Sequence, residues 1–452
     1  MANACILLLC VIVGSVVFVL KRIWDHLTRV PSVPKLQNTW WGPDEPTEGD
    51  SEIRPFRISI SENVLSDLRH RLKNSRPLKP PLEGTKHEYG INPKLTKEIV
   101  DYWAEKYDWR KRELYLNQMP QFKTKIQGLD IHFIHVIPKV PEGHRIFPLL
   151  LLHGWPGSFR EFYEIIPLLT SPKEGRDFVF EVIVPSLPGY GFSDPAVRSG
   201  MGAPQMAVVL KNLMLKLDRK KFFIQAGDWG SVIMSNMAIM FPEHVIAVHN
   251  NFCLDFSVKA TLKRVLYGFW PSLVVDEKYK RLVYPTTTFF SNLIGATGYY
   301  HIQATKPETI GAALSDSPMG LAAYILEKFI DENGDLTKKF TMESLLDNVM
   351  IYWVTNSMTT AIRLYAQTYH KNVSSLHIDR IPIPVPTGYA RFVNDAVYSP
   401  EALLKDKYPN LIHVSDLNGG HFAAMECPQT LASDLFDFTE KVLSLNENVL
   451  SS

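Results

Sequence analysis

Hydrophobic residues along this chain recur first at helical spacing and then in short runs. Residues 51–125 are predicted to be helical, since Leu65, Leu68 and Leu72 recur three to four positions apart after Ser61, a candidate N-cap. Strands are predicted at 130–136, 148–152, 178–184, 221–225, 381–385 and 411–414. Apolar runs that alternate with helices indicate a parallel sheet covered by helices on both faces.

The N-terminus carries the longest apolar run. Residues 4–20 are uncharged, and Lys21, Arg22 and Arg29 follow them. At ~1.5 Å per residue the run nearly spans a bilayer core. A cleaved signal peptide, the alternative, shows a basic start and small residues before its cleavage site; this run has neither. We therefore expect an uncleaved single-pass anchor, and the positive charges after it favour a cytosolic location for the rest of the chain.

The segment 222–231 is predicted to form a strand, a sharp turn and a helix around Asp228. Ala226 and Gly230 lie two residues before and two residues after Asp228. This is the spacing of a nucleophile elbow, in which small neighbours let a strained turn present one side chain. A carboxylate at that position attacks carbon and forms an ester. The alternative is an aspartate that caps a helix beginning at Ser231. Ser231 is a possible nucleophile itself, but it has no glycine two residues after it, as the elbow spacing requires.

A loop with the sequence His-Gly-Trp-Pro-Gly-Ser, residues 153–158, follows the strand at 148–152. Such a loop directs backbone N–H groups toward an active site. The N–H groups of Trp155 and Trp229 are predicted to form an oxyanion hole. The alternative is an ordinary Pro-Gly turn.

Two later segments supply a base and an acid. Gly419-Gly420-His421-Phe422 is a flexible turn before the last helix, so His421 is the candidate base. Asp395 is the candidate acid after the strand at 381–385, with Glu401 and Asp416 less well placed. Each has an ordinary alternative as a surface loop residue. The order nucleophile, acid, histidine is the chain order of α/β-hydrolases.

Taken together, these motifs match one known family along nearly the whole chain. The matching segments are 153–158, 186–193, 227–231 and 419–424, together with 40–42, 102–122 and 320–324. They resemble the microsomal epoxide hydrolases. Segments 158–163 and 191–194 are most similar to the insect juvenile hormone epoxide hydrolases.

The resemblance implies two lid tyrosines that hold and protonate the epoxide oxygen. They match Tyr299, with Tyr300 beside it as the open alternative, and Tyr365. Without the resemblance, either tyrosine would be interpreted as core packing with a tethered hydroxyl. One position departs from the family, whose acid is usually Glu. Here it is Asp395, which is one methylene shorter and orients His421 only if its loop lies closer.

Composition narrows the range of partners. Lys and Arg total 48 and Asp and Glu total 47, with no basic block, so nothing indicates nucleic acid. Cys5, Cys10, Cys253 and Cys427 have neither metal-site nor disulfide spacing, and reduced thiols are expected. The stretch 189–191 lacks the third glycine of a dinucleotide fingerprint. No metal, nucleotide or flavin cofactor is expected.

The predicted architecture is an α/β-hydrolase fold with a helical cap, an N-terminal helical extension and a membrane anchor. The strand pattern disappears between about 250 and 375, as expected for a helical insertion, and residues 30–50 are interpreted as an extended connector. The expected parts are an anchor at 1–22, an extension at 23–125, a core at 126–250 and 376–452, and a cap at 251–375.

The predicted activity is the conversion of a lipophilic epoxide to a vicinal diol through an ester on Asp228. Juvenile hormone and foreign epoxides are both candidate substrates, and the endoplasmic reticulum membrane is the expected location. A haloalkane dehalogenase is the alternative enzyme, and a lipophilic hormone-binding protein of the same fold is the alternative without catalysis. The sequence makes no prediction of oligomeric state.

Overall fold

The computed structural model describes residues 2–43, 52–255, 257–330, 335–395 and 397–445, with the backbone alone for residues 2–11. Its centre is a sheet with the strand order β1-β2-β3-β5-β4-β6-β7-β8-β9. The strands are β1 (Arg54–Phe56), β2 (Gln121–Ile126), β3 (Leu129–Val136), β4 (Arg145–Leu152), β5 (Phe178–Pro185), β6 (Phe222–Ala226), β7 (Val245–Asn250), β8 (Thr387–Phe392) and β9 (Leu411–Leu417). Strands β1, β2, β3 and β5 pair antiparallel, and the pairs from β5 to β9 are parallel.

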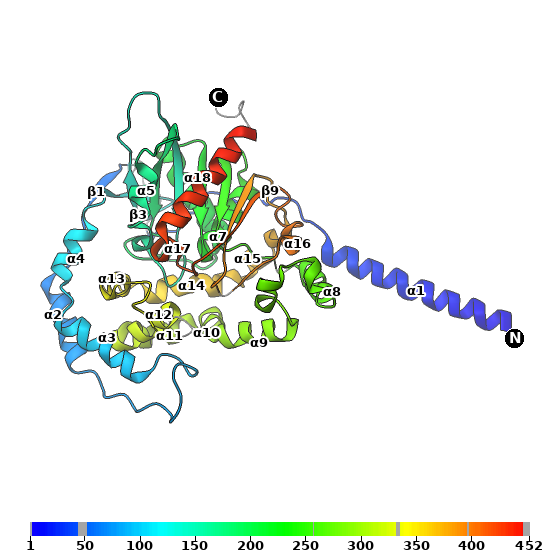
Figure 1. Ribbon diagram of the computed structural model, residues 1–452, viewed down its shortest axis with the longest axis horizontal. Coiled ribbons are helices and arrows are strands. Elements are labelled where there is room, and N and C mark those ends of the chain that lie inside the picture. Colours follow the sequence, from blue (N-terminus) through cyan, green and yellow to red (C-terminus); the bar gives the residue numbers. More distant parts are fainter. Residues whose placement is uncertain (1, 44–51, 256, 331–334, 396, 446–452) are drawn as a thin grey trace.

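Helices cover both faces of the parallel part of the sheet, as the sequence predicts. Every residue of β5 and β6 is buried, which requires cover on either side. Helices α6 (Ala203–Lys216) and α7 (Asp228–Met240) pack together, and α5 (Ile166–Thr170) packs against α18 (Pro428–Leu445) (Figure 1). The carboxyl ends of β4, β6, β8 and β9 therefore meet at one edge of the sheet.

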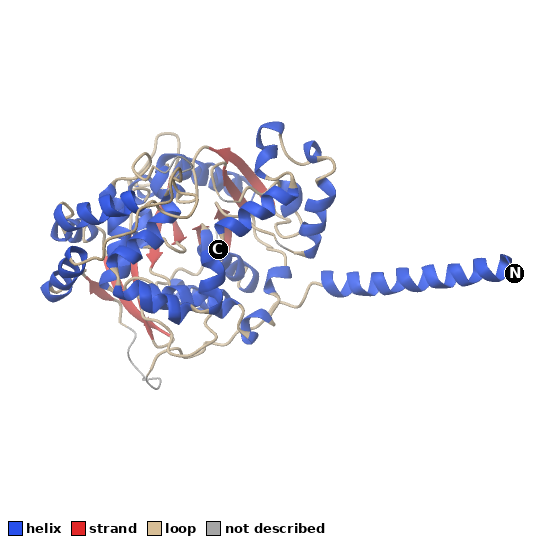
Figure 2. Cartoon of the chain, turned by 90° about the horizontal axis from the view of Figure 1, so that it is seen from below, coloured by secondary structure: helices blue, strands red, loops and turns tan. Residues whose placement is uncertain are grey.

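A helical cap lies between β7 and β8 in the sequence and beside that edge in space (Figures 1 and 2). Its α-helices are α8 (Val258–Tyr267), α9 (Thr286–Ala296), α10 (Gly298–Thr305), α11 (Pro307–Asp316), α12 (Pro318–Leu326), α13 (Met342–Val354), α14 (Met358–Thr368) and α15 (Lys371–Ser374). Helices α10 and α11 pack along α14. After β8, the short helices α16 (Glu401–Leu404) and α17 (Ala423–Glu426) lie on either side of β9 in sequence.

The N-terminal extension is helical only in part. Helices α2 (Glu62–Lys73), α3 (Pro93–Glu105) and α4 (Trp109–Leu116) form as expected, and α2 and α3 pack on α12 of the cap. The prediction of helix throughout 51–125 is wrong at both ends, because β1 and β2 extend the sheet there. Ser61 does precede α2, although its side chain makes no capping hydrogen bond.

The strand predicted at 381–385 is also misplaced, since β8 begins at Thr387. Pro382, Pro384 and Pro386 alternate with buried apolar residues and imitate the period of a strand. Proline has no N–H to donate to a sheet, so this stretch stays irregular and the strand forms only after it. The sequence analysis did not identify β7 as a separate strand.

Helix α1 (Ala2–Thr28) projects from the body of the protein (Figures 1 and 2). Its side chains from Ile12 to Leu20 are exposed. Among the side chains that the structure describes, no helix is both long and apolar enough to cross a membrane. Cys253 and Cys427 are free thiols, whereas the side chains of Cys5 and Cys10 and connector residues 44–50 lie outside the described part.

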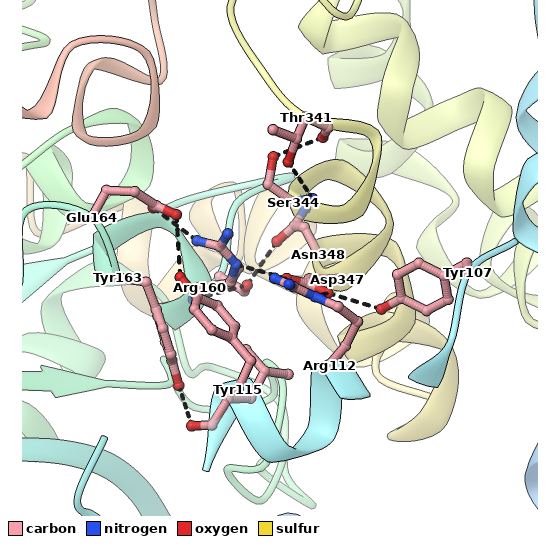
Figure 3. A network of polar contacts seen from close by, with 12 residues as sticks. Tyr107, Arg112, Tyr115, Arg160, Tyr163, Glu164, Thr341, Ser344, Asp347 and Asn348 are labelled. Carbon is pink, nitrogen blue, oxygen red and sulfur yellow. Dashed lines mark hydrogen bonds and ion pairs between the residues drawn. The ribbon is translucent and has the colours of Figure 1, made fainter. Parts of the chain in front are cut away.

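A buried ionic network joins the extension, the core and the cap (Figure 3). Asp347 of α13 has a fully buried side chain and accepts hydrogen bonds from Arg112 at 2.6 and 2.8 Å, from Arg160 at 2.9 Å and from Tyr107 at 2.9 Å. Arg160 lies in a short 3-10 helix, η1 (Phe159–Phe162), and also donates to Glu164 at 2.8 Å. The network fixes η1, and with it the loop that precedes η1 in the sequence.

Candidate active site

Asp228 occupies a strained turn between β6 and α7, as the elbow spacing predicts. Its φ angle is +44°, in the left-handed region that non-glycine residues rarely adopt. A Cβ atom on Gly154 would lie 2.0 Å from Oδ1 of Asp228, and one on Gly230 would lie 2.3 Å from the carbonyl oxygen of Leu152. Glycine at both positions therefore lets the turn come close enough to β4 to present the carboxylate. The Ser231 hydroxyl instead donates to the side-chain oxygen of Asn250, at the end of β7, at 2.6 Å.

The structure brings the predicted base and acid to Asp228. His421 Nε2 lies 3.5 Å from Oδ2 of Asp228, and His421 Nδ1 lies 2.9 Å from Oδ1 of Asp395. The Asp395 side chain is only 2% exposed, so the shorter acid reaches the histidine from within the protein. The other two candidate acids lie elsewhere: Asp416 pairs with Arg391 at 2.6 Å, and Glu401 is exposed at the start of α16.

The two carboxylates determine the charge of His421. Burial lowers the pKa of His421, but the negative charge of Asp395 and the hydrogen bonds to Asp228 and Asp395 outweigh it. Its pKa is thereby held well above the ordinary value. The two carboxylates therefore favour the protonated form of His421 in the free enzyme.

The loop at 153–158 supplies a backbone donor to the same carboxylate. The N–H of Trp155 donates to Oδ1 of Asp228 at 2.8 Å. His153 stays neutral because burial lowers its pKa to about 4. Its Nε2 lies 3.2 Å from the N–H of Leu187, and its Nδ1 lies 3.0 Å from the carbonyl of Gly154. The donor role of the Trp229 N–H stays a prediction.

Helix α13 of the cap holds this loop through two residues that the sequence analysis missed. The Asn348 amide donates to the carbonyl of Pro156 at 2.6 Å and accepts from the Ser158 hydroxyl at 2.7 Å. The Tyr352 hydroxyl donates to the carbonyl of Gly157 at 2.7 Å. Residues four apart share one face of a helix, so a polar pair at this spacing was the available signal.

Aromatic side chains from the cap cover Asp228. The Tyr299 ring stacks on Trp155 with centroids 5.0 Å apart, and the Tyr365 ring meets Trp229 edge to face at 4.8 Å. The Tyr300 hydroxyl already pairs with the Tyr369 hydroxyl at 3.2 Å. The Tyr365 hydroxyl, by contrast, is buried without a hydrogen-bond partner among the described residues.

These tyrosine hydroxyls keep their protons at neutral pH. Burial raises the pKa of Tyr299, Tyr300 and Tyr365, and the charge of Asp228 adds to the rise in each. The site thus combines a carboxylate on a strained turn, a histidine held between two carboxylates and protonated tyrosine hydroxyls whose rings lie beside the turn.

Two protein families and several known proteins match the sequence of this chain. Residues 53–162 match the family described as epoxide hydrolase N terminus, and residues 148–428 match the alpha/beta hydrolase fold family. Juvenile hormone epoxide hydrolase 1 of Ctenocephalides felis is 44% identical over 98% of this chain and 96% of the relative. Epoxide hydrolase 1 of Sus scrofa is 44% identical over 89% of this chain and 92% of the relative.

A solved structure agrees with these sequence matches. The crystal structure of juvenile hormone epoxide hydrolase from the silkworm Bombyx mori is 46% identical, covers 90% of this chain and 99% of that chain, and superposes with a TM-score of 0.88.

Proposed function

Since this chain belongs to the epoxide hydrolases of the α/β-hydrolase fold, an ether-bond-cleaving class of enzyme, we propose that it opens its epoxide with Asp228 as the nucleophile. One observation carries the proposal. The Asp228 carboxylate is presented on a strained turn between the Trp155 N–H and His421, beneath the buried and unpartnered hydroxyl of Tyr365. This arrangement combines a nucleophile with a proton donor for the leaving oxygen.

In the first step, Asp228 attacks a carbon of the epoxide ring and forms an alkyl ester. The carbon–oxygen bond of the ring breaks, and negative charge develops on the epoxide oxygen. Tyr299 and Tyr365 donate hydrogen bonds to that oxygen, and one of them passes its proton to it, so that no unsolvated alkoxide remains. Their raised pKa values leave both hydroxyls protonated and able to donate.

In the second step, His421 removes a proton from water, and the hydroxide attacks the ester carbonyl. Esterification removes the charge of Asp228, which is one of the causes that raise the pKa of His421. The pKa of His421 therefore falls once the ester has formed, so its neutral form, which can accept a proton from water, becomes more available while Asp395 orients it. The oxyanion is stabilised by the N–H of Trp155 and by that of Trp229, and the product is a vicinal diol.

The alternatives have less support. A dehalogenase needs donors that bind a halide, whereas the cap residues proposed to act here are tyrosines whose rings lie against Trp155 and Trp229. A hormone-binding protein without activity has no use for the contacts of His421 with Asp228 and Asp395.

Heavy-oxygen water tests the covalent step directly. A single turnover in it should leave the first diol unlabelled and place the label in Asp228, because the new diol oxygen comes from the carboxylate. His421→Gln should accumulate the alkyl-enzyme, and Asp228→Ala should form none. Heavy oxygen in the first diol would instead mean direct attack by water and would exclude the ester.

Juvenile hormone and foreign lipophilic epoxides are the proposed substrates, in line with the names of the relatives. An assay of diol formation on juvenile hormone beside a styrene-type epoxide distinguishes them. Preference for the styrene-type epoxide would assign the enzyme to foreign compounds.

The proposed location is the endoplasmic reticulum membrane, with residues 1–22 as the anchor and the catalytic part in the cytosol. The apolar run at 4–20 and the exposed apolar residues of α1 support this. An anchor would hold the enzyme where lipophilic epoxides concentrate. Residues 1–22 fused to a soluble reporter should carry the reporter to microsomes, and a reporter that stays soluble would refute the anchor.

A further inference from the structure

The wall of the active-site cavity carries a carboxyl group that the two steps above do not use, that of Glu161. The cavity lies beside the nucleophile and the base. Its lining residues are Gly154, Trp155, Gly157, Glu161, Gly227, Asp228, His421 and Phe422. Glu161 and Asp228 are the only two acids in this lining, and the proposed mechanism assigns a role only to Asp228.

The position of the Glu161 carboxyl is tightly set by the loop at 153–158. A Cβ atom on Gly157 would lie only 2.6 Å from Oε2 of Glu161, so the carboxyl group rests directly on that glycine. The backbone N–H of Glu161 donates to the carbonyl of Ser158 at 3.0 Å. The Trp155 N–H, two residues before Gly157, holds the nucleophile.

The network in Figure 3 keeps the side chain directed this way. Arg160, the preceding residue of η1, is tied to Asp347 at 2.9 Å and to Glu164 at 2.8 Å. A 3-10 helix has three residues per turn, so the side chain of Glu161 leaves η1 about a third of a turn away from that of Arg160. Arg160 thus points into the network while Glu161 lines the cavity.

The groups that face Glu161 come from several elements. His421 and Asp228 share its cavity, Glu426 belongs to α17 and Tyr352 belongs to α13 of the cap. Burial, together with the charges of Asp228 and Glu426, raises the pKa of Glu161 to about 8, although His421 opposes the rise. Glu426 itself is paired with Lys339 at 2.7 Å.

Formation of the ester changes this balance. The charge of Asp228 raises the pKa of Glu161 in the free enzyme, and esterification removes that charge. A neutral His421 no longer opposes the rise in this state, so the two changes act on the pKa of Glu161 in opposite directions. The intermediate is also the state that must bind and polarise a water molecule. A carboxylate accepts hydrogen bonds only, so it can hold a water hydrogen without blocking the oxygen lone pair that attacks.

We propose that Glu161 is a further catalytic residue that binds the hydrolytic water together with His421, an inference that rests on the proposed function. Glu161 accepts one hydrogen of the water, and His421 Nε2 takes the other as a proton. The water oxygen bonds to the carbonyl carbon of Asp228, and the ester bond to the substrate carbon–oxygen unit breaks. The departing alkoxide receives the proton from His421, and the proton left on the Asp228 carboxyl group restores the tyrosine that protonated the epoxide oxygen. Glu161 ends the cycle in the state in which it began.

The test is a rapid-quench measurement of alkyl-enzyme and diol in Glu161→Gln. Ester formation should keep its rate, because it needs no water. Ester hydrolysis should slow by about 10- to 100-fold, the scale of a misplaced reactant, and the alkyl-enzyme should accumulate. The hydrolysis rate of the unaltered enzyme should also rise with pH as Glu161 and His421 lose their protons, and the part of this rise that belongs to Glu161 should disappear in Glu161→Gln.

Glu174→Gln is the control, because it makes the same change at an exposed glutamate outside the network and the cavity. Hydrolysis should be almost unchanged in it. An equal defect in Glu174→Gln, or normal hydrolysis in Glu161→Gln, would overturn the proposal. If Glu161→Gln does not fold, Glu161→Asp provides the same test. Its carboxyl group is one methylene farther from the water, so ester hydrolysis should slow while ester formation keeps its rate. Absence of any alkyl-enzyme in the unaltered protein would instead refute the proposed function.

Discussion

Replacing Tyr365 by phenylalanine should change stability and catalysis in opposite directions. The Tyr365 side chain is almost completely buried, at 1% exposure, and its hydroxyl has no hydrogen-bond partner among the described residues. In the free enzyme this oxygen has only loose polar contacts, with the Tyr299 hydroxyl and the Trp229 side chain, in place of a well-formed hydrogen bond. In the proposed transition state it donates to the epoxide oxygen. Removal of the Tyr365 hydroxyl oxygen should therefore stabilise the free enzyme and destabilise the transition state of ester formation.

Both magnitudes follow from the surroundings of the hydroxyl. A buried polar group without a partner costs about 1–3 kcal/mol, so Tyr365→Phe should raise the free energy of unfolding by an amount of this order. Loss of one donor to a developing oxyanion is typically worth about 2.7–4 kcal/mol, or about 10²- to 10³-fold in rate. Ester formation should slow by that factor, and Tyr299 should account for the activity that remains.

Rapid-quench measurement of the alkyl-enzyme gives the rate, and urea unfolding followed by tryptophan fluorescence gives the stability. Tyr300→Phe is the control, because it loses a hydrogen bond of 3.2 Å to Tyr369. It should lower stability by about 0.5–1.5 kcal/mol with little change in ester formation. A full rate of ester formation in Tyr365→Phe would refute the donor role. If only Tyr300→Phe slowed it, the choice of Tyr299 within the adjacent pair would be wrong.

Three further variants test other parts of the argument. Asp395→Asn should slow ester hydrolysis by up to about 10⁴-fold, as in triads that lose their acid, and an unchanged rate would assign that role to another acid. Burial raises the pKa of Asp434 but its bonds to two histidines lower it more. Its stabilising contribution is therefore complete above about pH 4 and is lost as the pH falls further; acid unfolding that is identical in Asp434→Asn would contradict this. Asn372 begins an Asn-Val-Ser acceptor pattern and is exposed. It should stay bare in the native protein and gain sugar only after a cleavable signal peptide replaces residues 1–29; sugar on the unaltered protein would place the catalytic part in the lumen.

The parts of the site that are set by local chain geometry could be predicted from the sequence. The elbow needs small residues within two positions of Asp228, and the close approach of Gly154 to that carboxylate shows why. The pairing of Asp395 with His421 was also predictable, although the residues are 26 positions apart. Both follow strands whose carboxyl ends must meet at one edge of a parallel sheet.

The fold was predicted less well where the sequence pattern of a segment imitates that of another kind of element. Prolines alternate with apolar residues from 381 to 386, and the alternation predicts a strand although proline cannot donate to one. Strand β2 was likewise assigned to the helical extension, because its six residues alternate only weakly in polarity. Pairing with β3 decides the conformation there, and pairing is a contact between segments that no local pattern records.

The residues that hold the active site in place could not be predicted from local sequence patterns, for the same reason. Asn348 and Tyr352 reach the loop at 153–158 from about 190 positions away, and Asp347 bonds Arg160 from 187 positions away. Arg112 of the N-terminal extension shares that carboxylate. Removal of the extension would expose one side of a buried ion cluster and loosen the segment that carries Glu161 and the oxyanion loop. The extension therefore stabilises the active site from outside, although none of its side chains lines the active-site cavity.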